Sequence, residues 1–295
     1  MRRKIMSKKL KVLMIGAHLD DNDFCGGGTA LKYLERGHSV RFLSIANGSG
    51  GHHVLSPKEI AARRYKEAQA VAALTGLEYD VWDIEDCEVM ADLATRKRLI
   101  RYIREYNPDI IFTHRTNDYH ADHRNAAILV QDASYLVIVP NFCPEVPAMK
   151  EMPVIMFFRD KFKNPPFVPD VVVDIDDVME KKFEMFNCHV SQVYEWLPYT
   201  YGYLDQVPSG EAERFEWLKS PRVPRDRVLS LEELTERRET KHCEYKEALY
   251  AAKYRDLLIK RYGEAGKKVI FAEAFETSEY GSQLTKENKD VLFPF

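Results

Sequence analysis

Two groups of histidine and aspartate residues have the side chains that zinc enzymes use. The first is the sequence AHLDD at residues 17–21, directly after an apolar run. Zinc accepts imidazole nitrogen and carboxylate oxygen, and a catalytic zinc ion usually keeps three protein ligands and an open position for water. His18 and Asp21 can supply two of these ligands. Neighbouring side chains in extended backbone point to opposite sides, so we expect one of Asp20 and Asp21 to bind metal and the other to handle protons.

The second group lies between His114 and His123 and also contains His120 and Asp122. Either His120 or His123 can be the third metal ligand, which leaves the other histidine for acid–base work. Asp122 is suited to fix the orientation of an imidazole ring. For His114 two interpretations stay open, a contact to metal or substrate and a hydrogen-bonded structural histidine at the end of a strand.

Three glycines at residues 26–28 invite a different interpretation, because glycine loops let the backbone approach a pyrophosphate group. The G-x-G-x-x-G spacing of dinucleotide-binding proteins is absent, so we favour close packing of a first helix on the sheet. A nucleotide-binding oxidoreductase is therefore the weaker alternative. A metal-binding protein without activity is disfavoured as well, because metal binding alone needs neither Asp20 nor His120.

Short β-rich runs alternate with amphipathic helical segments through the first two-thirds of the chain, which predicts an α/β fold with a mostly parallel sheet. The expected strands are residues 11–17, 40–46, 79–83, 110–114 and 154–158. The expected helices are residues 28–36, 57–74, 93–106 and 122–135. Ligands of open α/β sheets bind beyond the carboxyl ends of the strands. Both groups of metal-binding residues directly follow expected strands, and we expect them to meet at that edge.

The character of the chain changes after residue 193, where a segment rich in proline, glycine and aromatic residues begins. A charged helix over residues 229–262 and a last strand over residues 268–275 are expected to follow. We therefore predict a core over residues 8–192 and a C-terminal extension over residues 193–295, packed on the core and made of a lid loop, a long helix and a final strand.

Composition places the chain among ordinary globular proteins, with 45% hydrophobic and 30% charged residues among its 295 residues. A net charge of -3 gives no basic surface for nucleic acid, so we expect a small-molecule partner. The five cysteines form no C-x-x-C pair, which is typical of reduced thiols and a cytoplasmic protein. No stretch approaches the roughly 20 apolar residues that a membrane-spanning helix requires.

The motifs together resemble those of the LmbE-like or PIG-L-like de-N-acetylases, in the same order and over nearly the whole chain. AHLDD is similar to the family's AHPDD, and Gly26 to Thr29 to its GGT run. The other similarities are Gly37-His38 with Val40 to GHxV, Arg64 with Glu67 to RxxE, His114 to Arg124 to H-x3-D-x-H-P-D-H-R, His189 to Gln192 to HxSQ, and Ala272 to Phe275 to AEAF. Leu19, Asn22 and Ala121 depart from the family pattern, and none of them carries a side chain assigned to metal or proton transfer.

This resemblance implies a Rossmann-like three-layer fold and a hydrolase that removes an N-acetyl group from an amino sugar or related amine. It implies His18, Asp21 and His123 as ligands of zinc or another divalent metal. By the same resemblance Asp20 is the general base, His120 stabilises or protonates the tetrahedral intermediate, and Asp122 orients His120. The residues expected to contact the substrate are Arg64, Asp86 and His114. A related zinc amidase that cleaves another acyl group stays open, and analogy with this fold family leads us to expect a homo-oligomer.

Overall fold

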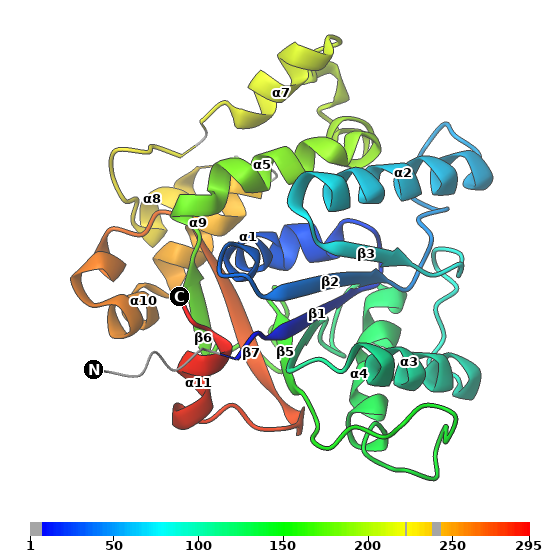
Figure 1. The fold of residues 1–295 in the computed structure, drawn as a ribbon. Coiled ribbons are helices and arrows are strands. Elements are labelled where there is room, and N and C mark those ends of the chain that lie inside the picture. The colour runs from blue at the N-terminus through cyan, green and yellow to red at the C-terminus, as the bar shows by residue number, and fades with distance from the viewer. Residues whose placement is uncertain (1–7, 222, 238–242) are drawn as a thin grey trace.

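The computed structural model describes residues 8–221, 223–237 and 243–295, and a seven-stranded sheet forms its centre (Figure 1). The strands follow the order β3-β2-β1-β4-β5-β7-β6. Their bounds are β1 (Lys11–Gly16), β2 (Ser39–Ser44), β3 (Glu78–Val81), β4 (Ile110–Thr113), β5 (Val154–Phe158), β6 (Val171–Asp174) and β7 (Ala272–Gly281). The first five strands pair in parallel, and β7 is antiparallel to β5 and β6. The predicted α/β fold with a mostly parallel sheet is confirmed.

Helices cover both faces of this sheet, which gives three layers (Figure 1). The helices of one face are α1 (Asp21–Glu35), α2 (Pro57–Thr75) and α5 (Met179–Cys188), and those of the other are α3 (Leu93–Tyr106) and α4 (Ala121–Leu136). Successive side chains of a strand point to opposite faces. Accordingly Met14 of β1 packs with α1, α2 and α5, whereas Ile15 packs with α3 and α4.

Helix α1 begins at Asp21, seven residues before the predicted start, and contains all three glycines. Glycine disfavours a helix interior, which is why the pattern predicted a later start. A Cβ atom at Gly26 would lie 3.0 Å from the Met14 sulfur, and one at Gly28 would lie 2.8 Å from Ile175 Cγ2. The glycines therefore allow α1 to pack closely on the sheet, as we expected.

The expected single helix over residues 229–262 is wrong. The described residues form three helices there, α8 (Leu231–Glu236), α9 (Cys243–Lys253) and α10 (Arg255–Tyr262). The chain leaves helical geometry at Tyr254, where φ is -114° and ψ is 31°. Buried residues on both sides of this break, including Ala251 and Leu258, pack in one cluster with β6 and β7. Tertiary packing thus bends a segment whose local pattern is helical throughout.

The last strand runs over Ala272–Gly281 instead of residues 268–275 and lies between β5 and β6. Residues beyond 193 therefore contribute a strand to the central sheet, next to β6. The sequence pattern predicted neither β6 nor α5. The boundary at residue 192 stays a prediction. The remaining helices are α6 (Leu197–Tyr201), α7 (Glu211–Lys219) and α11 (Lys286–Leu292). None of the helices within the described ranges has both the length and the apolar character needed to cross a membrane.

Candidate active site

The two groups of histidines and aspartates meet at the carboxyl ends of β1 and β4. These neighbouring strands pair in parallel, so the segments that follow them leave the sheet at the same edge. His18 lies between β1 and α1, and His114 directly follows β4. His120 is the residue that caps the N-terminus of α4, and His123 lies in the first turn of that helix. The predicted convergence of these loops is therefore present in the fold.

The side chains of His18, Asp21 and His123 converge and form a triangle in which each imidazole faces a different oxygen of the Asp21 carboxylate. His18 Nδ1 lies 3.2 Å from His123 Nε2 and 3.5 Å from Asp21 Oδ2, and His123 Nε2 lies 3.4 Å from Asp21 Oδ1. Ligands that bind a tetrahedral zinc ion at about 2.0–2.2 Å lie roughly 3.3–3.5 Å from one another. Two imidazoles and one carboxylate at this spacing fit a divalent metal such as zinc.

Two further carboxylates lie behind the imidazoles of the triangle. His18 Nε2 lies 3.1 Å from Asp122 Oδ2, and His123 Nδ1 lies 3.0 Å from Asp118 Oδ1. A carboxylate at one ring nitrogen holds the proton on that side and leaves the other nitrogen free for metal. In both rings the free nitrogen is the one that faces Asp21. Asp118 was not among the predicted site residues. A carboxylate between two histidines in one short loop could have indicated a partner for an imidazole.

Asp122 contacts His18 and not the expected His120. Its Oδ2 atom is 3.8 Å from His120 Nδ1, beyond hydrogen-bond distance, and accepts a 2.7 Å hydrogen bond from the backbone N–H of Cys87. His120 Nδ1 instead accepts a hydrogen bond of 3.1 Å from the backbone N–H of Asp122. The backbone of α4 therefore orients His120, and the Asp122 carboxylate is available to His18.

Arg64 and Asp86 hold protein groups in place, whereas the resemblance implied contacts to a sugar. Arg64 is only 3% exposed, and its Nη2 donates a 2.9 Å hydrogen bond to Asp20 Oδ1. Asp86 accepts hydrogen bonds from the backbone N–H groups of Gly48 and Gly50 at 2.8 and 3.0 Å. Arg64 thereby fixes Asp20, and Asp86 fixes the glycine-rich loop after β2.

The loop after β2 needs its glycines because Arg64 passes directly against it. A Cβ atom at Gly48 would lie 2.7 Å from Arg64 Cδ, and one at Gly51 would lie 2.6 Å from Arg64 Nη1. Gly48 also has a φ of +82°, which favours glycine. The opposite side of the loop is held by Gln192, whose Nε2 donates to the Gly51 carbonyl at 3.0 Å. Asp20, Arg64 and this loop therefore form one rigid unit.

Gln192 belongs to a π-helix, Ser191–Trp196, a conformation that is frequent at functional sites. Glu67 of α2 accepts hydrogen bonds from the backbone N–H of Ser191 at 2.9 Å and from its hydroxyl at 2.7 Å. Arg64 and Glu67, three residues apart on α2, thus do not pair with each other. Each connects α2 to a different part of the site.

His114 is buried and contacts two residues of the triangle. Its ring stacks on that of His123 with centroids 3.9 Å apart, and its Nε2 lies 3.1 Å from Asp21 Oδ2. The same nitrogen accepts a 3.2 Å hydrogen bond from the Ala17 backbone N–H. These contacts favour support of the ligands over the expected contact with substrate.

Aromatic side chains lie on the solvent side of the site. Tyr119 is 75% exposed, and its ring centroid is 5.3 Å from that of His123. On the loop after β2, His53 stacks against the half-exposed Tyr199 with centroids 3.9 Å apart and rings inclined by 5°. The exposed ring of Tyr119 therefore adjoins the polar triangle, and a separate aromatic stack lies on the loop after β2.

Electrostatics separates the histidines into two kinds. Burial lowers the pKa of His18, but hydrogen bonds to Asp122 and Asp21 outweigh it and raise the pKa to about 10. Burial together with the positive charges of His18 and His123 lowers the pKa of His120. In the metal-free protein His18 is therefore a positively charged imidazolium at neutral pH, whereas His120 is neutral. Because His120 Nδ1 accepts a backbone hydrogen bond, its proton is on Nε2, which can act as a donor.

Other groupings of the same side chains also have donor atoms within 4.8 Å of one another. Within the described ranges they are His18 with His120 and His123, Asp21 with His114 and His123, and Cys87 with His120 and Asp122. All of them overlap the triangle or adjoin it. The cluster as a whole can hold a metal ion.

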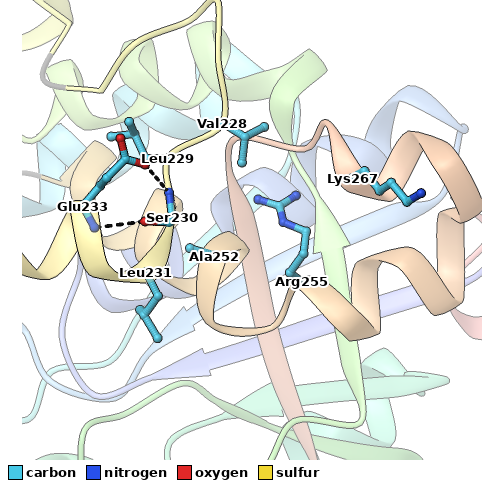
Figure 2. A pocket seen from close by; sticks show the side chains of 8 residues that line it. All are labelled: Val228, Leu229, Ser230, Leu231, Glu233, Ala252, Arg255 and Lys267. Atoms are coloured by element: carbon cyan, nitrogen blue, oxygen red, sulfur yellow. Dashed lines mark hydrogen bonds between the residues drawn. The ribbon is translucent and has the colours of Figure 1, made fainter.

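An open hollow of about 480 Å³ is lined by residues of α8, α9, α10 and the segments beside them, and by none of this cluster (Figure 2). Its lining residues are Val228, Leu229, Ser230, Leu231, Glu233, Ala252, Arg255 and Lys267. Ser230 and Glu233 exchange hydrogen bonds of 2.7 and 3.1 Å as a capping box of α8, drawn as dashed lines in Figure 2. Arg255 donates to the Gly266 carbonyl at 2.8 Å. These polar groups serve the fold of the C-terminal segment.

The part of the chain that carries this site is similar to a known protein family and to characterised enzymes. The family described as PIG-L, GlcNAc-PI de-N-acetylase, matches residues 13–134, the range that contains both groups of histidines and aspartates. A diacetylchitobiose deacetylase of Thermococcus kodakarensis is 30% identical over 205 residues, which cover 64% of this chain and 74% of the relative. A 4-oxalmesaconate hydratase of Pseudomonas putida is 25% identical over 207 residues, 68% of this chain and 80% of the relative.

Solved structures share the fold over almost the full length. The N,N'-diacetylchitobiose deacetylase of Pyrococcus horikoshii superposes with a TM-score of 0.64 at 22% identity and covers 91% of this chain and 83% of its own. The 4-carboxy-2-hydroxymuconate hydratase of Pseudomonas putida gives a TM-score of 0.67 at 18% identity, covering 94% and 98%. At these identities the structures establish the fold alone.

Proposed function

The chain belongs to the PIG-L (LmbE-like) family, and its relatives include a deacetylase and a hydratase. We propose that it is a metal-dependent de-N-acetylase. Its reaction would be hydrolysis of the acetyl amide of an N-acetylated amino sugar or related amine, releasing acetate. The observation that carries this proposal is the triangle of His18 Nδ1, Asp21 and His123 Nε2, with sides of 3.2 to 3.5 Å.

His18, Asp21 and His123 are the residues that would hold zinc or another divalent ion. When bound, such an ion supplies Lewis acidity for a carbonyl and makes a water molecule acidic near neutral pH. Asp122 and Asp118 keep the two imidazoles in the orientation that this task requires.

Asp20 would accept the proton of the attacking water and return it to the amine nitrogen as the C–N bond breaks. It precedes Asp21 in the chain, so the base and the metal-binding carboxylate leave the end of β1 together. The 2.9 Å hydrogen bond from Arg64 holds the Asp20 carboxylate in one place. A base fixed by a buried guanidinium needs little reorganisation during proton transfer, which favours catalysis.

His120 would stabilise the tetrahedral oxyanion as a neutral donor. Its pKa is lowered and its Nδ1 is used by the backbone of α4, so Nε2–H is the group that can point at a developing negative charge. A neutral imidazole at a helix N-terminus acts in this way in other enzymes. Of the two roles that the family resemblance implied for His120, this is stabilisation of the intermediate and not its protonation.

A hydratase is the second candidate, because the Pseudomonas putida relative covers more of this chain than the deacetylase relative does. Its name indicates a carboxylated substrate, and carboxylates call for cationic side chains. Near the site, Arg64 pairs with Asp20, Arg63 pairs with Glu195, and Arg124 donates to the Asp118 and Tyr119 carbonyls. The use of these arginines by the protein itself favours a neutral substrate such as an N-acetylated sugar.

Acetate release from a panel of N-acetylated amino sugars and their conjugates tests the proposal. Zinc-loaded wild type is compared with Asp20→Asn, which keeps the shape of the side chain and removes the base. We expect release by wild type and a loss of about 100-fold or more in the variant at equal zinc content.

Two results would overturn the proposal. The first is that zinc-loaded protein releases no acetate from any amide but consumes an unsaturated tricarboxylate of the kind named for the hydratase relatives, which would assign a hydratase. Release of a longer acyl group in place of acetate would assign a related amidase.

A further inference from the structure

The first helix of the site is crossed by a buried carboxylate from the last strand. In a regular α-helix the backbone N–H groups of Gly28 and Thr29 would bond to the carbonyls of Phe24 and Cys25. Here Gly28 N–H donates to Glu273 Oε1 at 2.8 Å, and Thr29 N–H donates to Glu273 Oε2 at 2.7 Å. Glu273 belongs to β7 and is fully buried. α1 is one continuous helix from Asp21 to Glu35, so Glu273 holds it by two amides near its middle.

Two cations contact the preceding turn of the same helix. The carbonyl of Phe24 accepts hydrogen bonds from Arg159 Nη2 at 3.1 Å and from Lys182 Nζ at 3.3 Å. Lys182 also donates to Glu273 Oε1 at 2.6 Å. A carbonyl in the first turn of α1 is therefore held by positive charge, and two amides of the following turn are held by a carboxylate.

The signs of these charges match the backbone groups that they contact. A carboxylate accepts from backbone N–H groups and cations donate to a backbone carbonyl, and hydrogen bonds with a charged partner are stronger than neutral ones. Glu273 makes the first kind of contact, and Lys182 with Arg159 makes the second. Gly28 makes the approach feasible, because a Cβ atom there would lie 3.1 Å from Glu273 Oε1.

A second carboxylate completes the network. Glu247 of α9 accepts a 2.6 Å hydrogen bond from Lys182 and forms an ion pair with Arg159. Lys182, Glu247 and Glu273 are each 0% exposed. Buried charges of this kind are costly to separate, so their mutual positions are firmly set.

We infer that Glu273, together with Lys182 and Arg159, positions the first turn of α1 and through it Asp21, so that β7 and α9 act as positioning elements of the metal site. Asp21 lies in that turn, three residues before the carbonyl that the cations cap. Glu273 is a positioning residue and not a catalytic one. Its effect on metal binding rests on the proposed role of Asp21 as a ligand, whereas its effect on the helix does not.

Glu273→Gln tests this inference in the full-length protein, because the amide keeps the shape of the side chain and removes its charge. Two readouts are needed, hydrogen exchange of backbone amides over residues 21–29 and the affinity and visible spectrum of bound Co²⁺. We expect exchange at least about tenfold faster in this segment and a Co²⁺ affinity about 10–100-fold lower, with an altered spectrum. Arg159→Lys, which keeps the charge and removes the guanidinium, gives a milder change in the same direction if Glu273→Gln does not fold.

Arg104→Gln is the matched control, because Arg104 is also a buried charge but donates to carbonyls between residues 136 and 146. At a similar loss of stability it leaves the exchange of residues 21–29 and the Co²⁺ spectrum unchanged. Unchanged exchange in Glu273→Gln, or an equal change in Arg104→Gln, overturns the inference. Faster exchange with unaltered Co²⁺ binding overturns the link to the metal site. Asp21→Ala separates the two proposals, since unaltered Co²⁺ affinity in that variant contradicts the proposed ligand set, while the exchange data still decide how α1 is held.

Discussion

His18 Nε2 and Asp122 Oδ2 lie 3.1 Å apart, although 104 positions separate them in the chain. The contact connects the loop after β1 to the first turn of α4, and it leaves Nδ1 of the same ring facing Asp21 and His123. One carboxylate thus decides which nitrogen of His18 is available to a metal ion. The same contact explains why Asp122 is fully buried beside a partly exposed cluster.

Replacing Asp122 by asparagine is expected to weaken zinc binding about 10–100-fold, because the partners of metal-bound imidazoles contribute affinities of that order. Competition with a chromophoric chelator measures the change. Asp132→Asn is the control, since Asp132 lies on the same helix and pairs with Arg96 at 2.5 Å. Equal zinc affinities in the two variants would contradict the role of Asp122.

Zinc affinity is expected to rise with pH. Asp122 and Asp21 outweigh burial and raise the pKa of His18 to about 10 in the metal-free protein, so a proton must leave before Nδ1 can bind metal. At a pH below that pKa, zinc must displace this proton, and the apparent affinity falls about tenfold for each unit by which the pH is lowered. We therefore expect binding at pH 8 to be at least about 100-fold tighter than at pH 6. Calorimetry in two buffers of different ionisation enthalpy should count about one released proton or more. Binding that is independent of pH in this range would rule out a protonated His18.

Arg64→Lys is expected to lower kcat by about 10–100-fold at full zinc content, because a lysine cannot hold Asp20 with the geometry of the guanidinium and small displacements of a reacting group have effects of this size. Steady-state kinetics together with metal analysis separates this effect from loss of zinc. Arg98→Lys is a suitable control, because Arg98 lies on α3 over the ring of Trp82. A rise in KM alone would instead support the sugar contact that the family resemblance implied for Arg64.

Lys182→Met is expected to lower the free energy of unfolding by about 3–5 kcal/mol, since it leaves the Glu247 and Glu273 carboxylates without a shared buried cation. Denaturant unfolding measures this difference. The neighbouring Lys181→Met removes an exposed ion pair with Glu184, which contributes about 0–1 kcal/mol. Similar effects of the two substitutions would show that the buried network adds little stability.

The strands that bring the site together could be predicted from local pattern alone. Apolar runs near residues 11–16 and 110–113 read as strands because β-rich segments alternated with helical ones. The residue types that follow each strand were sufficient to indicate zinc chemistry. The C-terminal segment was predicted less well, because β7 pairs with β5 and β6 through contacts between residues 98 to 121 positions apart.

The sequence by itself determined the α/β class and the two groups of candidate metal-binding residues, since periodicity, residue type and spacing are properties of short segments. Tertiary structure alone decided that Asp122 contacts His18, that Arg64 holds Asp20, and that Glu273 contacts the backbone of α1. The physical reason is that a carboxylate or guanidinium has several potential partners within reach of its own segment. Which of them it meets depends on the packing of helices onto the sheet, and no local pattern records that choice.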